Sequence, residues 1–470
     1  MHSETCYYHR VRIQGTLTTV SALHIGSGEL KEATVLGEAV TYNALCRSQT
    51  NQAYLPAATL RGFLAEVGCA VDNALHHRVF GYAEAEAGQA GALRVYDAIL
   101  SSLGPLPLQP VSPNTALRSY VALNPITGVA EAHQLFNLEY VPTGSVFRCD
   151  LELEHVDAQI LSYVLELLTY WDGTARSSLG SGASKGRGRV KWNLEQIAVL
   201  TDTALQHWLT SEQSLTESYE ILSKPLIPAI SPITEQQIIF RLYPQAPFLL
   251  NDPAYVSARE SDVDSSLPAL EYSRTPDNHA LIPATALRGW MRGRARRILL
   301  TLLVANGIDW HSANTQADNL LEPLFGSTRQ QSLLWFDDAI SPQIVEPHCQ
   351  MFNGVDRFTG GVANGKLYQV RAAECDYLEG KLYLPKALPA EWCNGLLLLV
   401  IRDALEGDLV LGWGKGRGYG SFNLGIRLGT IFVKGWAGLK ASLQRRYNIH
   451  FGLAALHKQI TQINGSDASA

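Results

Sequence analysis

The feature that most constrains the fold of this chain is a glycine-rich segment that occurs twice. Residues 411–420 read Leu-Gly-Trp-Gly-Lys-Gly-Arg-Gly-Tyr-Gly, and residues 179–188 read Leu-Gly-Ser-Gly-Ala-Ser-Lys-Gly-Arg-Gly. Alternating glycines permit positive φ angles and close approach of another backbone, while the interleaved cations suit a phosphate chain. One such segment is typical of a hairpin turn with solvated charges. Two of them, each containing Lys-Gly-Arg-Gly, indicate a duplicated domain.

Further segments match between the two halves in the same order. The pairs are residues 55–62 with 282–289, 80–81 with 325–326, 97–98 with 338–339, and 123–128 with 355–360. Chance does not easily produce an ordered set of this kind. The sequence therefore predicts two diverged copies of one domain, called copy one and copy two below.

The chain has 470 residues, a length at which two to four domains are common. We expect a first domain over residues 1–200, a linker over 201–237 and a second domain over 238–427. Residues 428–470 are expected to form a helical extension that ends in a disordered tail from Asn464 to Ala470. The linker prediction depends on a polar helix and a proline-rich stretch.

Hydrophobic periodicity predicts the same order of elements in each copy: strand, helix, strands, helix, strand. Alternation at Val11, Ile13 and Leu17 predicts the first strand, and a helix is expected to begin after Pro56. This order predicts an α+β fold with two tandem ferredoxin-like, RRM-like domains that carry inserted loops and β-hairpins. Copy two shows no aromatic strand of the kind on which RRM domains stack bases.

Charge and cysteine content restrict the class of protein. The net charge of −6 is not that of a free-standing nucleic-acid binder, so a basic surface must be local. Seven scattered cysteines without a Cys-x-x-Cys pair argue for a reducing cytoplasm and against a structural zinc site. The longest apolar run, Leu396–Ile401, is too short to span a bilayer, and we read no signal peptide.

Candidate phosphate-binding residues lie in the glycine loops and at the helix starts that follow Pro56 and Pro283. They are Lys185, Arg187, Lys415, Arg417, Thr59, Arg61, Thr285, Arg288 and Arg292. Free N–H groups at a helix start can bind a phosphate, although a plain capped helix is the alternative. The second helix also carries Arg294, Arg296 and Arg297 without an acidic residue, which favours a phosphate track over a solvated basic face.

Together these motifs resemble the RAMP superfamily of CRISPR systems (repeat-associated mysterious proteins). The motifs on which the resemblance rests are the Leu-His-Ile-Gly-Ser-Gly loop at residues 23–28, the Pro-Ala-x-x-Leu-Arg-Gly helix start, the Asp-Arg-Phe-Thr-Gly segment at 356–360 and the terminal glycine loop. The resemblance covers residues 11–192 and 238–424. Within the superfamily the chain looks most like a fused tandem pair of type III backbone subunits, as in the III-D branch.

The resemblance implies a subunit that binds guide RNA, pairs it with target RNA and assembles with other CRISPR effector subunits in the cytoplasm. It also implies a projecting "thumb" hairpin and, in catalytic subunits, an aspartate in the loop after the first strand that cuts target RNA. Asp252 occupies that place in copy two, with Asp262 and Asp264 as further candidates, and Glu29 is nearest in copy one. A divalent metal, Mg²⁺ or Mn²⁺, is expected for cleavage, with Asp252 as a possible ligand.

Several alternatives stay open. Asp252 precedes Pro253 and can be an Asx-turn residue, and His24 can be a general base or a structural histidine. The chain can be a structural guide-RNA binder without cleavage, or a guide-processing nuclease, although no paired histidines indicate the latter. A nucleotide-dependent enzyme is a weaker reading, because neither glycine loop has the spacing of a P-loop or a dinucleotide fingerprint.

Overall fold

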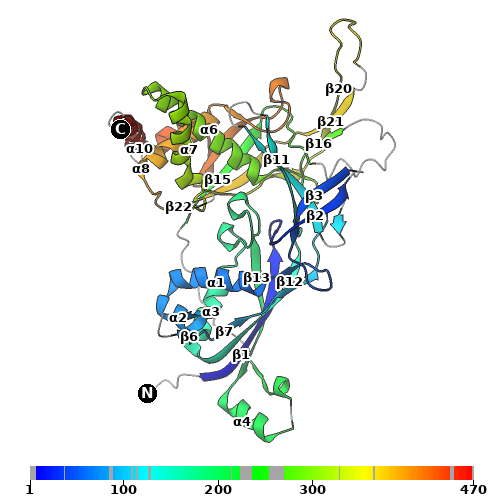
Figure 1. Ribbon diagram of the computed structural model, residues 1–470, viewed down its shortest axis with the longest axis vertical. Helices are drawn as coiled ribbons and strands as arrows, with labels where there is room; N and C mark the ends of the chain where they lie inside the picture. Colours follow the sequence, from blue (N-terminus) through cyan, green and yellow to red (C-terminus); the bar gives the residue numbers. More distant parts are fainter. Residues whose placement is uncertain are drawn as a thin grey trace.

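The computed structural model describes residues 7–35, 38–83, 88–106, 110–112, 115–124, 129–212, 214–222, 235–252, 269–327, 329–363, 366–444 and 449–467. The chain forms two α+β units that follow one another along the long axis of the molecule (Figure 1). The predicted α+β class is confirmed, and copy one and copy two each contain a large, mainly antiparallel sheet.

Copy one is built on a sheet with the order β14-β13-β1-β12-β8-β4, to which β7 is added by pairing with β12. Its central strand β1 (Tyr7–Thr19) pairs with β12 (Val146–Asp157) on one side and β13 (Val190–Leu200) on the other. The predicted alternation is confirmed, because Val11, Ile13 and Leu17 are fully buried. The remaining strands are β4 (Tyr54–Leu55), β7 (Leu93–Val95), β8 (Ala98–Ser102) and β14 (Glu220–Ile221).

Helices α1 (Ala57–Val71), α2 (Asn73–Phe80) and α3 (Ala158–Leu168) cover this sheet and share its core. Helix α1 begins after Pro56 as predicted, and it buries Leu60 and Leu64. A small hairpin of β5 (Gly81–Ala83) and β6 (Gly88–Ala90) follows α2.

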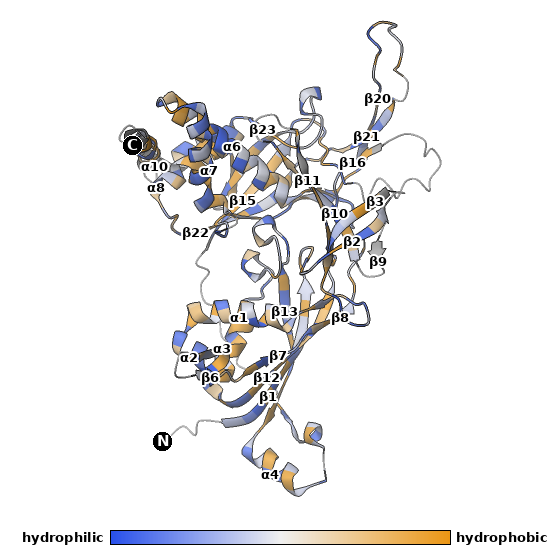
Figure 2. Ribbon diagram, in the orientation of Figure 1, coloured by the Kyte–Doolittle hydropathy of each residue, from blue (hydrophilic) through white to orange (hydrophobic). Residues whose placement is uncertain are grey.

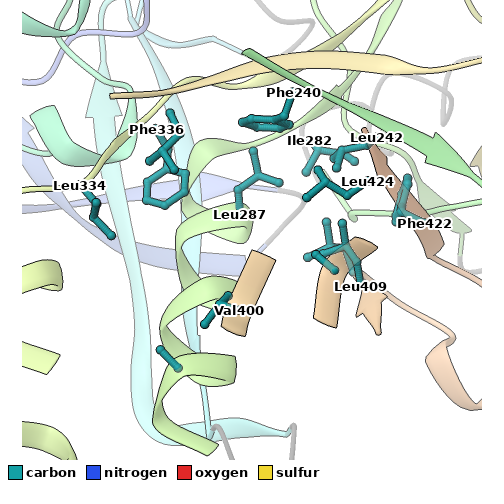
Figure 3. Close-up of a cluster of buried hydrophobic side chains, with 14 of the residues drawn as sticks. Phe240, Leu242, Ile282, Leu287, Leu334, Phe336, Val400, Leu409, Phe422 and Leu424 are labelled. Carbon is teal, nitrogen blue, oxygen red and sulfur yellow. The ribbon is translucent and has the colours of Figure 1, made fainter. Parts of the chain in front are cut away.

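Copy two repeats this plan with the order β23-β24-β15-β22-β19-β17, while β18 pairs with β22 and β25 with β24. The strands are β15 (Glu235–Pro244), β17 (His279–Ile282), β18 (Trp335–Phe336), β19 (Ala339–Ile344), β22 (Leu378–Pro385), β23 (Leu409–Val410), β24 (Ser421–Leu428) and β25 (Ile431–Lys434). The helices are α6 (Ala284–Ala305), α7 (Trp310–Phe325) and α8 (Glu391–Leu405). Helices α6 and α7 carry hydrophilic as well as hydrophobic residues, as expected for helices with one face in the core (Figure 2). Figure 3 shows that Phe240, Leu287 and Leu424, among others, form that core.

Each copy also has a second, smaller sheet. In copy one it has the order β2-β3-β11-β10-β9, and in copy two the order β16-β21-β20. The strands are β2 (Gly26–Val35), β3 (Glu38–Leu45), β9 (Pro110–Ser112), β10 (Thr115–Leu123), β11 (Ala130–Tyr140), β16 (Ala269–Glu271), β20 (Pro347–Phe352) and β21 (Tyr368–Ala373). The smaller sheet of copy one extends alongside copy two, and the β20–β21 hairpin projects from the molecule (Figure 1).

The structure differs from the sequence-based expectations at three places. Residues 26–28 were expected in a loop but belong to strand β2, because β3 supplies a pairing edge. The polar helix expected within the linker is α4 (Asp202–Thr210), but the strand β14 that follows pairs with β13 of copy one, which was not expected. The C-terminal region forms α9 (Trp436–Gln444) and α10 (Ile449–Asp467), so the predicted tail is helical up to Asp467.

Helix α10 packs closely on α8. A Cβ built on Gly395 would lie 2.2 Å from the carbonyl oxygen of Gly452. Glycines at the crossing therefore let the two backbones touch, which attaches the C-terminal helix to copy two.

Candidate functional site

The two glycine loops have the same backbone conformation. The first holds the 3₁₀ turn Ala183–Lys185 and the second the turn Lys415–Arg417, each flanked by two glycines in the left-handed region. The N–H of Leu179 donates to the carbonyl of Gly188 at 2.8 Å, and the N–H of Leu411 donates to that of Gly420 at 2.8 Å. The ten residues of each loop therefore correspond from end to end.

This correspondence corrects the sequence match. The shared letters Lys-Gly-Arg-Gly lie at residues 185–188 in the first loop and 415–418 in the second, which is two positions out of structural register. In the structure Lys185 corresponds to Arg417, and Arg187 corresponds to Tyr419. Because left-handed glycines define the loop, the backbone is conserved between the copies while the cations have moved.

The two loops differ in what covers them. A Cβ built on Gly186 would lie 2.8 Å from the carbonyl oxygen of Phe336 and 3.1 Å from the Cβ of Ala284, both in copy two. At the corresponding Gly418, no atom of the described residues lies within 4 Å of such a Cβ. The first loop is thus part of the junction between the copies, whereas the second is open and exposes Lys415 and Arg417.

Ion pairs cross the junction at the first loop. Arg189, which is only 6% exposed, pairs with Asp337 and donates from Nη2 to the carbonyl of Phe336 at 3.2 Å. From strand β10, Arg118 Nη2 lies 3.7 Å from Oδ2 of Asp252. Three arginines of copy one, Arg118, Arg187 and Arg189, favour the ionised form of Asp338, although burial raises the pKa of that carboxyl. The arginines of the junction thus come from copy one and the aspartates from copy two.

The helix starts are capped by aspartates. Asp97 Oδ1 accepts a hydrogen bond of 2.7 Å from the Ala57 N–H, and Asp338 Oδ1 accepts one of 2.7 Å from the Ala284 N–H. These aspartates belong to the duplicated Asp-Ala pairs of the sequence. Each therefore occupies the first N–H that was expected to face a phosphate, while Thr59 and Thr285 lie half-buried in the same helical turns.

Arg61 and Arg288 make structural contacts at equivalent places. Arg61 Nη2 donates to the carbonyl of Phe80 at 2.7 Å, and Arg288 Nη2 donates to the carbonyl of Phe325. Each arginine connects the first helix of its copy to the C-terminal end of the next helix, where a cation is favourable. A structural role thus accounts for the arginine of both Leu-Arg-Gly motifs.

The expectation that no carboxylate balances the arginines of α6 is wrong. Arg294 pairs with Asp403 at 2.7 Å, and Arg296 pairs with Asp318 at 2.9 Å. These carboxylates lie on α8 and α7, so a search along the helix could not find them. Of the two remaining arginines, Arg292 and Arg297, each is exposed.

Cations of both copies nevertheless gather where the first loop meets α6. Lys185 of the loop is close to Arg187 and Arg288, and both neighbours together with burial lower its pKa. Arg292 also acts on Arg288, whose pKa burial lowers. Arg187 lies 4.6 Å over the ring of Tyr120, and its Nε and Nη1 have no hydrogen-bond partner among the described residues. Cations of both copies are thus held close together at this place.

The second loop combines cations with aromatic rings. Arg417 lies 5.2 Å from the ring centroid of Trp413 and 5.7 Å from that of Phe352, and it bonds to the Tyr368 hydroxyl. Phe352 and Tyr368 are stacked at 5.6 Å, as Tyr120 and Phe136 are at 5.4 Å in copy one. Sequence reasoning missed these cross-strand pairs, although aromatic residues on both sides of the hairpin were a usable signal.

Asp252 lies at the junction. Its N–H donates to the carbonyl of Glu271 at 3.0 Å, and its carboxylate faces Arg118 and the Ser273 hydroxyl, which is 3.5 Å away. The side chain is 13% exposed. Asp262 and Asp264 lie outside the described residues. The predicted acid is therefore placed next to a cation supplied by the other copy.

The residue of copy one that corresponds to Asp252 is Ser27, and Glu29, the nearest acid in the sequence, lies two residues further along. The Ser181 N–H donates to the His24 carbonyl at 3.0 Å, and the Trp413 N–H donates to the Leu249 carbonyl at 2.7 Å, so His24 and Leu249 are equivalent. Ser27 lies three residues after His24, and Asp252 lies three residues after Leu249. Glu29 is exposed, with its carboxylate 3.5 Å from Lys31 Nζ.

His24 occupies a structural position. It is 5% exposed, and its Nδ1 lies 2.6 Å from the carbonyl oxygen of Glu139. Burial lowers the pKa of His24, Arg187 lowers it further, and the bond to the Glu139 carbonyl opposes both. A buried ring fixed to the backbone does not face substrate, so the structural reading of His24 is favoured over the general base.

Asp252 was expected as a possible ligand of a divalent metal ion. The described part of the chain contains no group of three or more His, Cys, Asp or Glu side chains that could hold one. The group opposite Asp252 is Arg118, a cation. The expected Mg²⁺ or Mn²⁺ stays a prediction, because residues 253–268, which include Asp262 and Asp264, lie outside the described residues.

Sequence comparison places the chain in a family. The model of the RAMP superfamily matches residues 16–191 and 267–423, one region in each copy. No curated protein matches the chain. Among the described residues no helix is long and apolar enough to cross a membrane. Because the matched regions cover more than half of the chain and fall on its two structural copies, the chain belongs to the RAMP superfamily.

Proposed function

We propose that the chain is a fused backbone subunit of a type III, III-D-like CRISPR effector complex in the cytoplasm. It binds guide RNA, pairs it with target RNA and cleaves the target at copy two. Membership of the RAMP superfamily supports this, because such proteins typically bind CRISPR RNA within multi-subunit complexes. The strand orders β13-β1-β12-β8 and β24-β15-β22-β19 support two tandem ferredoxin-like domains.

The observation that carries the proposal is the cation cluster at the junction. Lys185 of copy one lies close to Arg288 of copy two, on which Arg292 also acts, and like charges held close together repel one another unless an anion offsets the repulsion. A phosphate of the guide backbone supplies that anion. The cluster joins the two copies, so a bound guide would cross from one copy to the other there.

The thumb of copy two supports pairing with a target. The β20–β21 hairpin projects away from the body (Figure 1), and the Phe358 side chain near its tip is fully exposed. Asp356 stabilises the tip turn by accepting bonds from the N–H groups of Phe358 and Thr359 at 2.8 and 3.0 Å. An apolar ring held out in this way suits insertion between base steps of a duplex.

For cleavage we assign Asp252 as the general base. It takes the proton of an RNA 2′-OH, the 2′-oxygen attacks the adjacent phosphorus, and the P–O5′ bond breaks. The products are a 2′,3′-cyclic phosphate and a 5′-OH that receives its proton from water. Arg118 lies on the same side and suits the charge of the phosphate. No step is assigned to a metal ion, and assays with Mg²⁺, Mn²⁺ or EDTA test whether one is needed.

The test of guide binding compares two cations of the cluster with an arginine outside it. Lys185→Ala and Arg292→Ala should each weaken guide-RNA binding and lower the salt slope by about one unit, since each removes one phosphate contact. Arg297→Ala is the matched control, because Arg297 is exposed on the same helix five residues further along. Equal effects of all three variants would exclude the cluster as the guide site.

A purely structural guide-binding subunit is the second candidate. The observation that favours it is the ion pair of Asp252 with Arg118, because a largely buried, paired carboxylate can serve the junction alone. Loss of one target cut in Asp252→Asn, with assembly and guide binding unchanged, separates the two candidates.

A further inference from the structure

The junction between the copies uses one face of each copy, so each copy also has the equivalent of the face that the other copy uses there. The outer face of copy two is the open second glycine loop with β20. The outer face of copy one is the start of α1 with β7 and residues 26–28. An interface of this head-to-tail kind, if it repeats, produces an open filament. The residues on the outer faces decide whether it repeats.

The end of copy two lacks the arginines of the junction. Strand pairing aligns Arg118 of copy one with Gln350 of copy two. Arg118 pairs with Leu138, three residues before Val141, and Gln350 pairs with Val370, three residues before Ala373. Val141 and Ala373 are equivalent, because each bridges to the loop after the first strand of its copy, at Leu23 and Phe248. Arg187 corresponds to Tyr419, whose hydroxyl bonds to the Gln350 side chain. The two neighbouring cations of copy one are thus replaced by a neutral hydrogen-bonded pair.

The third arginine is lost as well. Arg189 directly follows the first glycine loop, and Ser421 directly follows the second. Their carbonyls accept equivalent bonds, from Val20 N–H at 2.7 Å and from Gln245 N–H at 2.9 Å. The side chain that pairs with Asp337 across the junction therefore has only a serine hydroxyl as its counterpart at the end of copy two.

The outer face of copy one lacks the matching carboxylates. Ser27 stands where copy two has Asp252, and Tyr96 stands where it has Asp337. Of the three aspartates on the junction face of copy two, only Asp338 has an aspartate as its equivalent in copy one. That residue is Asp97, and it is exposed. Tyr96 is 46% exposed, and its hydroxyl donates to Glu152 at 3.3 Å.

A second copy of this chain docked on the open loop would therefore recreate none of the ionic contacts of the junction. Gln350 would meet Ser27, Ser421 would meet Tyr96, and the Asp97 carboxylate would face Tyr419 at the place of Arg187. We propose that the arginine–aspartate pairs encode the order of the copies, so that the open second loop docks a RAMP-type domain of another chain rather than a second copy of this one. This proposal goes beyond RNA binding, because it concerns contacts between protein chains that form without RNA.

The choice of a RAMP-type domain as the partner follows from the loop itself. The first loop already holds such a domain, in contact with the start of α6 and the carbonyl of Phe336. The second loop has the same left-handed glycines and is open at Gly418. The second loop thus keeps the backbone shape that contacts a RAMP-type domain. The side chains around it have lost the arginines that would pair with aspartates of a second copy of this chain.

The experiment transfers the charges of the junction to the ends, in protein free of RNA. One variant carries Gln350→Arg and Ser421→Arg on the face of copy two. The other carries Ser27→Asp and Tyr96→Asp on the face of copy one. When the two variants meet, the new arginines face the new aspartates, as Arg118 and Arg189 face Asp252 and Asp337 at the junction. Light scattering after size-exclusion chromatography should show monomers for wild type and for each variant alone. An equimolar mixture of the two variants should give a complex of twice the chain mass that dissociates as salt is raised.

Two controls keep the outcome clear. Each variant is mixed with wild type, where only one side is charged, and no complex is expected; circular dichroism checks that both variants fold. A mixture of folded variants that stays monomeric would overturn the charge code. A wild-type chain that forms head-to-tail oligomers with rising concentration would overturn it as well, because the neutral ends would then be sufficient.

Discussion

The two glycine loops share one backbone and have different surroundings. The first is closed by copy two: Arg187 and Arg189 are buried, Arg189 pairs with Asp337, and burial and the neighbouring Arg187 and Arg288 lower the pKa of Lys185. The second is open and presents Lys415 and Arg417 beside Trp413. The comparison shows that a duplicated loop can serve as an internal contact in one place and stay open in the other, because the neighbouring side chains differ.

The largest effect is expected where the copies differ in a single acid. Asp252→Asn should reduce one target cut by a factor of about 10² or more, since the amide keeps the turn but cannot accept a proton. Ser27→Ala at the equivalent place, and Glu29→Ala or Glu32→Ala nearby, should leave every cut intact. The readout is the set of fragments from labelled target RNA, and a cut lost from Ser27→Ala would mean that copy one is active too.

The next effect concerns the junction itself. Asp337→Ala should destabilise the chain by about 3–5 kcal/mol, because it leaves Arg189 buried without its carboxylate. Tyr96→Ala, the equivalent change on the outer face of copy one, should cost less, since that ring is exposed. Urea unfolding of both variants measures the difference, and equal losses would show that the ion pair is not the source of the asymmetry.

A smaller effect is expected at the open loop. The double variant Lys415→Ala, Arg417→Ala should weaken guide-RNA binding and reduce the salt slope by about two units, one for each lost phosphate contact. Lys440→Ala is a control at an exposed lysine of α9. Filter binding at several salt concentrations gives the slopes, and a slope equal to that of wild type would return the second loop to a structural role.

The smallest effect is a pH dependence that copy one has and copy two lacks. Because the pKa of His24 is lowered in the folded chain, the unfolded chain binds more protons as the pH falls below about 6.5. Stability should therefore be full above that pH and decrease on acidification, by at most about 1.4 kcal/mol per pH unit. His24→Leu introduces the residue of copy two, Leu249, and should flatten the decrease. Thermal unfolding at pH 7.5 and 5.5 compares the two proteins, and an unaltered pH dependence in His24→Leu would assign it to other groups.

The sequence by itself determined the duplication, the α+β class, the first strands and the helix starts. These follow from local patterns: alternation at Val11 and Ile13, proline at a helix start, and glycine where φ is positive. The glycine loops were found for the same reason. Sequence matching placed the two loops in the wrong register, because it aligns the identical residues Lys-Gly-Arg-Gly. The hydrogen bonds between Leu179 and Gly188 and between Leu411 and Gly420 fix the structural alignment.

Only the tertiary structure decided which charges are available. Arg294 and Arg296 have no acidic neighbour within their helix, yet Asp403 and Asp318 reach them from α8 and α7. Asp252 and Arg118 are 134 positions apart, and pairing them requires the smaller sheet of copy one to extend along copy two. Electrostatic interactions depend on distance in space and on burial, and sequence separation specifies neither. For that reason the motifs could be read from the chain, but the division of the two loops into a closed and an open one could not.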